Sequence, residues 1–239
     1  MKLKYIFLNV ILIFNITNIK ASESNSSIVN SWKFIKKIPE NYSTIGAISP
    51  FSQSTANCII KYLEQYILEN QNNKLMFLEV GAGTGNLTFN FVQLLENLNI
   101  NYQLDIVELN PDFCLILQDR FKDYPKVNVY CEDVTKWDTK TNYNIIVSTL
   151  PFNSQIFTSP VIDEIINKFE SLIEKSGLII YVEYIFVGKI YKNLLSNKKK
   201  KDFESKQEIL NAFKQRHETK RDIVLNNIPP TYLYFLKTI

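Results

Sequence analysis

Three glycines stand two positions apart at the end of an apolar run, a pattern that serves ligand binding. Residues 75–80 are apolar except for Glu79, and Gly81, Gly83 and Gly85 follow before a helical pattern begins. Glycine lets the backbone turn tightly and approach a ligand closely, because no Cβ stands in the way. Strand, glycine-rich turn and helix predict the first unit of a nucleotide-binding sheet. Glu79 would suit a cationic or amine-bearing ligand and would repel a pyrophosphate.

Two acids follow the next predicted strands. Residues 103–108 are predicted to form a strand that ends in Glu108, and Glu108 follows Gly85 by 23 positions. An acid about 20 residues after such glycines commonly binds ribose, and its two oxygens can accept from both hydroxyls. Residues 127–133 are predicted to form a third strand followed by Asp133. Carboxyl ends of parallel strands meet at one edge, so we expect both acids at one site.

A fourth predicted strand, residues 143–151, ends in a Ser-Thr-Leu-Pro-Phe turn. With the glycine turn as motif I and this turn as motif IV, the chain resembles the class I S-adenosylmethionine-dependent methyltransferases. The resemblance implies an enzyme that uses S-adenosyl-L-methionine. The cofactor-binding residues that it implies are Glu79, Gly81, Gly83, Gly85, Glu108, Asp133 and Ser148. The catalytic, acceptor-facing residues that it implies are Thr149, Leu150, Pro151 and Phe152.

A narrower resemblance concerns the methyl acceptor. Residues 44–52, residues 226–234 and the Leu-Pro pair of motif IV resemble bacterial phospholipid N-methyltransferases. This resemblance implies methyl transfer to the amine of a phospholipid headgroup such as phosphatidylethanolamine. Methylation of that amine ends in a quaternary cation, which aromatic faces attract. The aromatic candidates are Tyr42, Phe152, Tyr181 and Tyr184.

Motif IV also bears on the alternative acceptors. Adenine N6-methyltransferases carry an asparagine in this motif, and its amide bonds the target amine. The matching residue here is Thr149, which lacks a carboxamide, and the sequence therefore favours a phospholipid over RNA. The alternatives are an enzyme like the ribosomal RNA adenine N6-dimethyltransferases and a cofactor-binding domain without catalysis.

Helical and apolar segments alternate along the chain in a way that predicts the fold. Helices are expected at residues 54–70 and 87–98, from Asn110-Pro111 to about 121, and from Ser159-Pro160 to about 176. A fifth strand over 178–184 and a closing hairpin over 222–236 complete the pattern. We predict a Rossmann-like, doubly wound, mostly parallel α/β sheet of the class I methyltransferase type, with a C-terminal antiparallel hairpin strand. The methyltransferase domain is assigned to residues 51–239.

The first 50 residues are set apart from that domain. Residues 1–21 have a basic start and an apolar stretch, and they fit a cleaved signal peptide, a shallow membrane anchor or a start codon placed too early. Residues 22–50 are a polar linker and an amphipathic arm around Trp32, with lysines opposite its apolar side. This arm fits either a helix at a membrane surface or a helix packed on the edge of the domain. We expect membrane association, at the cytoplasmic face if the chain stays inside the cell. The signal-like segment leaves export or organelle targeting open.

Residues 186–221 form a basic insertion. They contain eleven Lys and Arg and four Asp and Glu, a local net charge of +7 against +3 for the whole chain. Such asymmetry indicates an anionic partner, and an anionic membrane surface is preferred over RNA. The run Lys198 to Lys201 would otherwise be a solvated, partly disordered loop.

Cysteine usage bears on the compartment. Cys58, Cys114 and Cys131 are an odd number of cysteines without metal-ligand spacing. We therefore expect no disulfide framework and no metal site, and instead buried free thiols as found in reducing compartments.

Overall fold

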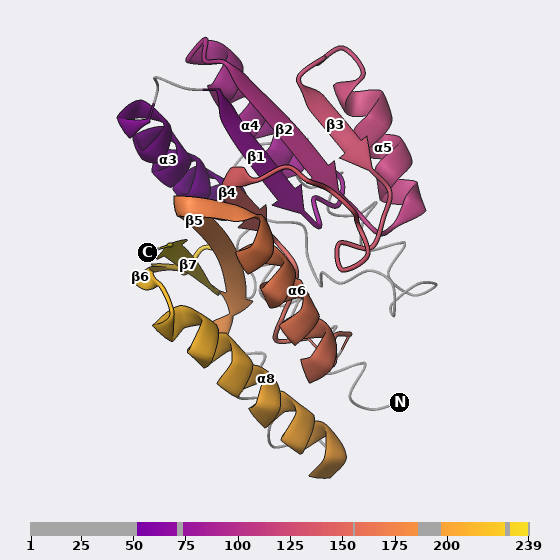
Figure 1. Ribbon diagram of the computed structural model, residues 1–239, viewed down its shortest axis with the longest axis vertical. Coiled ribbons are helices and arrows are strands. Elements are labelled where there is room, and N and C mark those ends of the chain that lie inside the picture. The colour runs from indigo at the N-terminus through magenta and orange to yellow at the C-terminus, as the bar shows by residue number, and fades with distance from the viewer. Residues whose placement is uncertain (1–51, 71–73, 155, 186–196, 228–229, 239) are drawn as a thin grey trace, which may run out of the picture. The chain divides into compact units, whose positions relative to one another are not determined.

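The computed structural model describes residues 52–70, 74–154, 156–185, 197–227 and 230–238, and these residues build one sheet with helices on both faces (Figure 1). The strands are β1 Leu75–Val80, β2 Tyr102–Val107, β3 Val127–Tyr130, β4 Tyr143–Ser148, β5 Ile173–Tyr184, β6 Glu218–Val224 and β7 Thr231–Lys237. The helices are α3 Gln53–Glu69, α4 Asn86–Asn97, α5 Pro111–Phe121, α6 Ser159–Leu172 and α8 Asn197–Gln215.

The strand order is β3-β2-β1-β4-β5-β7-β6. Strands β1 to β5 are parallel, whereas β7 runs antiparallel to both β5 and β6. This arrangement confirms the predicted mostly parallel sheet with its C-terminal antiparallel hairpin. The chain leaves β1 toward β2 on one side, and β4 lies on the other. Ligands bind beyond the carboxyl ends of the strands at such a switch point.

Two hydrophobic clusters hold the helices on the sheet. Side chains of α3, α4 and α5 pack on one face, and side chains of α6 and α8 pack on the other. The central strands β1, β2 and β4 are buried on both faces, as parallel strands between two helical layers must be.

The boundaries of two elements differ from the sequence prediction. Helix α6 ends at Leu172, and β5 begins at once with Ile173, whereas the sequence predicted a helix to residue 176 and a strand from 178. Ser176 has a positive φ of 61°, and the register between β4 and β5 shifts near Tyr143. The glycine after Ser176 therefore lies within an irregular strand and does not end a helix.

The start of α6 shows a second difference. Its N-cap residue is Thr158, not Ser159, and the Thr158 side chain makes no capping bond. The backbone N–H of Ser159 instead donates to Asp202 Oδ1 at 2.8 Å. Asp202 belongs to α8, so a residue distant in the sequence caps this helix.

The basic insertion is largely regular structure. The lysines expected in a loop, Lys198 to Lys201, lie exposed in the first turns of α8. The last basic residues of that segment, Lys220 and Arg221, belong to β6, which begins at Glu218 and is longer than predicted. The segment therefore supplies one helix and one edge strand.

Several predictions concern residues outside the described part of the chain. The signal-like segment 1–21, the amphipathic arm within 22–50 and Tyr42 all lie there. Within the described ranges, no helix combines the length and apolar character needed to cross a membrane. In the same ranges, no three His, Cys, Asp or Glu side chains gather as a metal site.

Candidate active site

The glycine turn between β1 and α4 lies at the switch point of the sheet. Gly81, Gly83 and Gly85 all have positive φ, at 78°, 58° and 78°. A Cβ on Gly81 would lie 2.6 Å from Leu150 Cδ2, and one on Gly85 would lie 2.7 Å from Leu117 Cδ2. These two glycines therefore allow close packing. A Cβ on Gly83 would meet no atom within 4 Å, so the turn is open to a ligand there.

Glu108, directly after β2, joins the glycine turn to α5. It is buried, and its Oε2 accepts from the backbone N–H of Gly83 at 2.9 Å. Its Oε1 accepts from the N–H of Asn110 at 2.9 Å, and Asn110 is the N-cap of α5. Glu108, the acid predicted to bind ribose, thus contacts the glycine turn at Gly83, where the turn is open to a ligand.

Glu79 lies beneath the same turn, at the end of β1. It is 1% exposed, and neither carboxylate oxygen has a hydrogen-bond partner within the described residues. Burial raises the pKa of Glu79 to about 7; the neighbouring Thr88 hydroxyl lowers it, and the Glu108 charge raises it. A buried carboxylate without a partner fits an amine-bearing ligand, because the amine would supply the missing donors.

Asp133 follows β3 at the same carboxyl edge. Its Oδ1 accepts from the backbone N–H of Thr135 at 3.0 Å and from the Thr135 hydroxyl at 2.8 Å. Its Oδ2 lies 4.0 Å from Lys136 Nζ. Because β2 and β3 are parallel neighbours, Asp133 and Glu108 stand on adjacent strand ends.

The motif IV turn after β4 closes on the glycine turn. The hydroxyl of Thr149 donates to the carbonyl oxygen of Gly81 at 2.6 Å. Ser148 is fully buried, and its Oγ accepts from the N–H of Leu150 at 3.4 Å. Thr149 therefore holds two halves of the site together through a hydroxyl, where adenine N6-methyltransferases have a carboxamide.

The aromatic candidates lie deeper than a cation-binding surface would require. Phe152 is fully buried and packs against the rings of Phe157, Phe169 and Tyr181. Tyr181 is also fully buried, and Tyr184 is 6% exposed. A role of these rings at the methyl acceptor stays a prediction.

Helix α8 supports the motif IV turn from behind, which the sequence did not predict. Lys206 Nζ donates to the carbonyl oxygen of Ser154 at 3.1 Å and pairs with Asp202 at 2.9 Å. Gln207 donates to Asn153 Oδ1 at 2.7 Å. Lys206 is 3% exposed, a rare location for lysine, which makes its two contacts structurally significant.

A buried acid, Glu183 near the end of β5, extends this network. It accepts from Asn153 at 3.4 Å, from the Tyr181 hydroxyl at 3.1 Å and from Lys214 at 3.3 Å. In the sequence, Glu183 stands out only because it alternates with apolar residues in a predicted strand. That pattern fits a solvent-facing residue as well as a buried acid with several hydrogen bonds.

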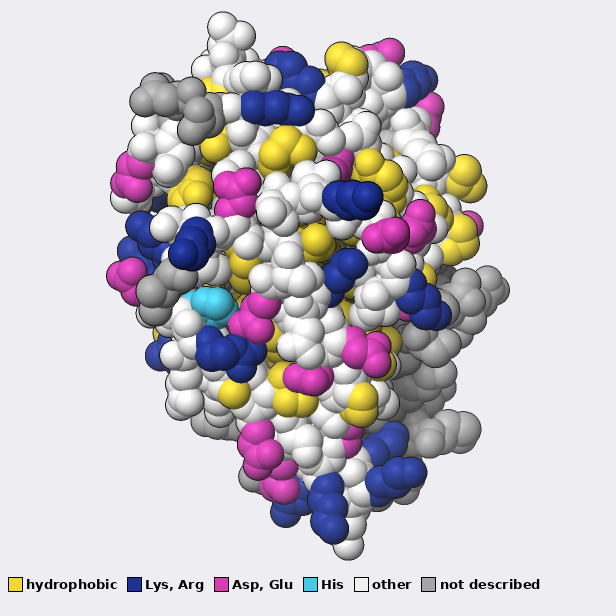
Figure 2. Space-filling model, in the orientation of Figure 1, with side chains coloured by type: hydrophobic (Ala, Val, Ile, Leu, Met, Phe, Trp, Pro, Cys, Tyr) yellow, Lys and Arg dark blue, Asp and Glu magenta, His cyan; other side chains and the backbone are white. Residues whose placement is uncertain are grey.

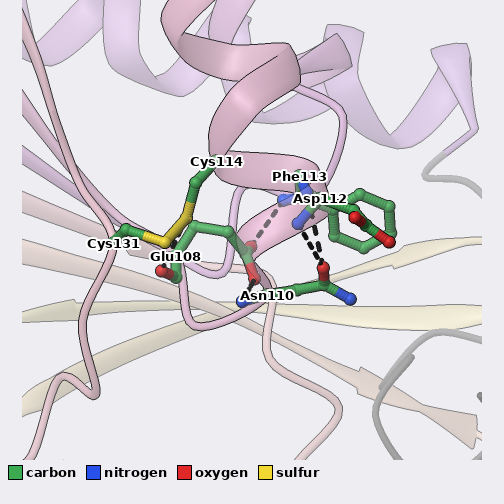
Figure 3. The surroundings of a disulfide bond; sticks show 7 residues. Glu108, Asn110, Asp112, Phe113, Cys114 and Cys131 are labelled. Atoms are coloured by element: carbon green, nitrogen blue, oxygen red, sulfur yellow. Dashed lines mark hydrogen bonds between the residues drawn. A yellow bond between two sulfur atoms is a disulfide. The ribbon is translucent and has the colours of Figure 1, made fainter.

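The structure contains a disulfide that corrects the cysteine prediction. Cys114 of α5 and Cys131 after β3 are bonded, with their Cα atoms 5.7 Å apart, and Cys58 is free (Figure 3). The expectation of free thiols at these two positions was wrong. The two residues are 17 positions apart in the sequence, and the packing of α5 against β3 brings them together.

The strand order, the glycine turn and the two strand-end acids define a class I S-adenosylmethionine-dependent methyltransferase. The model of the family named ribosomal RNA adenine dimethylase matches residues 51–202, and the chain belongs to this family. The match includes the glycine turn, both acids and the motif IV turn. It supports the RNA alternative better than the phospholipid prediction.

Individual relatives agree with the class. The chain is 36% identical over 90 residues to a probable ribosomal RNA small subunit methyltransferase A of Methanococcoides burtonii, covering 38% of this chain and 30% of that protein. A ribosomal RNA small subunit methyltransferase A of a Synechococcus strain is 27% identical over 96 residues, covering 40% of this chain and 31% of that protein. The chain thus spans less than a third of the length of these relatives.

Solved structures show the same fold. The N-methyltransferase NodS of Bradyrhizobium japonicum, in complex with S-adenosyl-L-homocysteine, aligns with a TM-score of 0.56 and 10% identity over 79% of this chain and 89% of that one. The methyltransferase domain of the citrinin polyketide synthase aligns with a TM-score of 0.59 and 18% identity over 83% and 56%. The cofactor of this chain is S-adenosylmethionine. It fits the open space at Gly83, the carboxylate of Glu108, and Glu79, whose carboxylate has no hydrogen-bond partner among the described residues.

Proposed function

We propose that this methyltransferase transfers methyl groups to an adenine amine in RNA. The observation that carries the proposal is the family match over residues 51–202, which spans both the cofactor side and the acceptor side of the site. Bound S-adenosylmethionine would supply a methyl group on a positively charged sulfur. The chain would hold the acceptor amine in line with that methyl group and keep water away, which can lower the barrier by roughly 7–11 kcal/mol.

The side chains around motif IV favour an acceptor that is already neutral. Thr149 and Asn153 are not bases, and the carboxylate of Glu183 accepts from three donors, one of them the ammonium group of Lys214. The exocyclic amine of adenine is uncharged at neutral pH and can attack without first losing a proton. An alkyl ammonium group titrates near a pKa of about 10, as lysine does, and would need a base.

The exposed lysines at the start of α8 also suit RNA. Lys198 to Lys201 lie together in the first turns of the helix, and no acid stands in its first turn. Figure 2 shows Lys and Arg side chains at the lower end of the molecule, where α8 begins in Figure 1. Phosphate groups contribute much of RNA affinity through such cations.

One observation favours the phospholipid amine as a second candidate. Thr149 has no carboxamide to bond an adenine amine, and its hydroxyl is committed to Gly81. In the adenine reading, backbone carbonyl groups of the turn would have to accept from the amine instead.

A labelling experiment decides between the two acceptors. The protein lacking residues 1–21 is incubated with methyl-labelled cofactor and either unmodified ribosomal RNA or vesicles containing phosphatidylethanolamine. We expect label in RNA, recovered as N6-methylated adenine after digestion. Label in the lipid alone would reject the RNA proposal and establish the phospholipid candidate.

A further inference from the structure

The Cys114–Cys131 disulfide lies beside Glu108, the acid predicted to bind the ribose of the cofactor (Figure 3). Cys114 is buried in α5, whereas Cys131 is exposed just beyond the last residue of β3. Methyl transfer from a sulfonium uses neither sulfur. The position of this bond therefore needs an explanation other than the chemistry of the reaction.

On the α5 side, the disulfide is joined to the ribose acid by short contacts. Cys114 Sγ lies 3.2 Å from the carbonyl oxygen of Glu108. The side chain of Asn110 accepts from the N–H groups of Asp112 and Phe113 and so starts α5 (Figure 3). The backbone N–H of Asn110 donates to Glu108 Oε1. A shift of α5 at Cys114 would therefore move the groups that orient the Glu108 carboxylate.

On the β3 side, the disulfide lies next to the second acid. The pairing of β2 with β3 ends at Val107 and Tyr130, and the N–H of Glu108 donates to the carbonyl oxygen of Tyr130 at 3.0 Å. Beyond that bond the chain leaves the ladder, and Asp133 follows Cys131 by two residues. The disulfide ties this departing segment to α5.

We propose that the Cys114–Cys131 disulfide is a positioning element of the S-adenosylmethionine site, which fixes Asp133 relative to Glu108, and that its reduction weakens cofactor binding. The proposal rests on the cofactor and not on the identity of the methyl acceptor. The two cysteines act through the acids and do not themselves touch the ligand.

The exposed position of Cys131 gives a reductant access to the bond. A thiolate of a dithiol attacks Cys131 Sγ, the Sγ–Sγ bond breaks, and Cys114 leaves as a thiolate that takes up a proton. The second thiol of the reductant then closes its own disulfide and releases Cys131 as a thiol. Two electrons and two protons pass from the dithiol to the protein, and the reverse reaction restores the bond.

The test measures binding of S-adenosyl-L-homocysteine by calorimetry, before and after dithiothreitol treatment of the wild-type protein. Intact mass after alkylation reports which cysteines are free. We expect the Kd to rise by about tenfold or more on reduction, a change worth about 1.4 kcal/mol, and to return on reoxidation. In turnover, the KM for the cofactor should rise while the KM for the acceptor changes little.

Two variants complete the test, and the second of them is the control. The double variant Cys114→Ser, Cys131→Ser should bind as weakly as the reduced wild type and should not respond to dithiothreitol. Cys58→Ser, which alters the free cysteine beside Asp222, should respond as the wild type does.

Three outcomes would overturn the proposal. The first is equal affinity of the oxidised and reduced protein with both thiols verified by mass. The second is failure of the two cysteines to pair in protein folded under oxidising conditions. The third is global unfolding of the reduced protein at the assay temperature, detected by circular dichroism, because the bond would then serve the whole fold and not this site.

Discussion

At the scale of single residues, Glu79 is the most unusual group in the site. Its carboxylate is 1% exposed and has no hydrogen-bond partner among the described residues, so it is costly to keep ionised. Its pKa is raised by burial to about 7, well above the ordinary value of 4.5. Near neutral pH the protonated and the ionised forms of Glu79 are therefore both populated, and a bound cationic ligand would favour the ionised form.

The raised pKa predicts how stability depends on pH. The unfolded chain ionises Glu79 near 4.5 and the folded chain near 7, so the folded state binds the proton more tightly. Its contribution to stability is complete below pH 4.5 and is lost as the pH rises to about 7, by about 3 kcal/mol in total. Urea denaturation between pH 4.5 and 8 should show this loss in the wild type relative to Glu79→Gln. The exposed Glu132→Gln should follow the wild type; parallel curves for Glu79→Gln would contradict the assignment.

Gly83 and Glu108 together predict the strength of cofactor binding. Gly83→Val would place a branched side chain in the open space and at a φ of 58°, so binding of S-adenosyl-L-homocysteine should be abolished. Glu108→Gln retains the shape but loses the charge, and binding should weaken roughly tenfold to a hundredfold, since hydrogen bonds to charged groups contribute about 1.5–3 kcal/mol. Calorimetry gives both values, and the thermal midpoint checks that each variant is folded. If both variants bound the ligand with unchanged affinity, the cofactor would not bind at this edge of the sheet.

At the scale of elements, α8 links two surfaces of the enzyme. Its first turns carry the exposed lysines, and its middle holds the carbonyl oxygen of Ser154 and the side chain of Asn153. The motif IV turn is thus supported by a helix whose amino end is exposed to anionic partners.

This arrangement predicts a selective effect of Lys206→Met. The substitution retains the buried methylene packing but removes the donor to Ser154 and the ion pair with Asp202. We expect a loss of about 1–3 kcal/mol of stability and a several-fold lower kcat, with unchanged affinity for S-adenosyl-L-homocysteine. The exposed Lys175→Met, in β5, should leave kcat at the wild-type level. Equal losses of cofactor affinity and kcat in Lys206→Met would show general damage to the fold.

The sequence predicted the elements whose signals are local. The apolar runs of β1, β2 and β4 mark central strands, and Asn110 with Pro111 marks the start of α5, because these features depend on a few adjacent residues. The disulfide and the capping of Ser159 by Asp202 were not predictable, since both join residues that only the packed sheet brings together. Helix α8 was missed because its buried side is narrow, consisting of Lys206, Leu210 and Phe213.

At the scale of the whole molecule, the amino end of α8 carries a concentration of positive charge. The exposed run Lys198 to Lys201 should make binding of a polyanion sensitive to salt. Replacing these four lysines with glutamine should reduce the slope of log K against log salt for single-stranded RNA by up to about 3. Fluorescence anisotropy measures the slope, and Lys74→Gln, next to the amino end of β1, is the control.

The same titration with anionic vesicles tests the predicted membrane association. If replacing the four lysines changes neither slope, Lys198 to Lys201 are an ordinary solvated surface.

The compartment of the protein can be argued from the disulfide. Disulfides persist in oxidising compartments, whereas the cysteine count had suggested a reducing one. Together with the signal-like residues 1–21, this bond leads us to propose an oxidising organelle compartment that also contains S-adenosylmethionine and RNA, in place of the cytoplasmic face of a membrane. Alkylation of free thiols in intact cells before lysis, followed by mass analysis, should find only Cys58 modified. Modification of all three cysteines would indicate that the protein resides in a reducing compartment.

The disulfide also changes the covalent topology of the chain. Because it joins Cys114 to Cys131, it closes a ring that contains most of α5 and all of β3. A protease that cuts inside this ring, for example after Lys122 or Lys126, opens the ring without separating the chain into two molecules. Glu108 and Asp133 would remain on one covalent body, and a nicked enzyme would gain only the mass of one water molecule until a reductant released the halves.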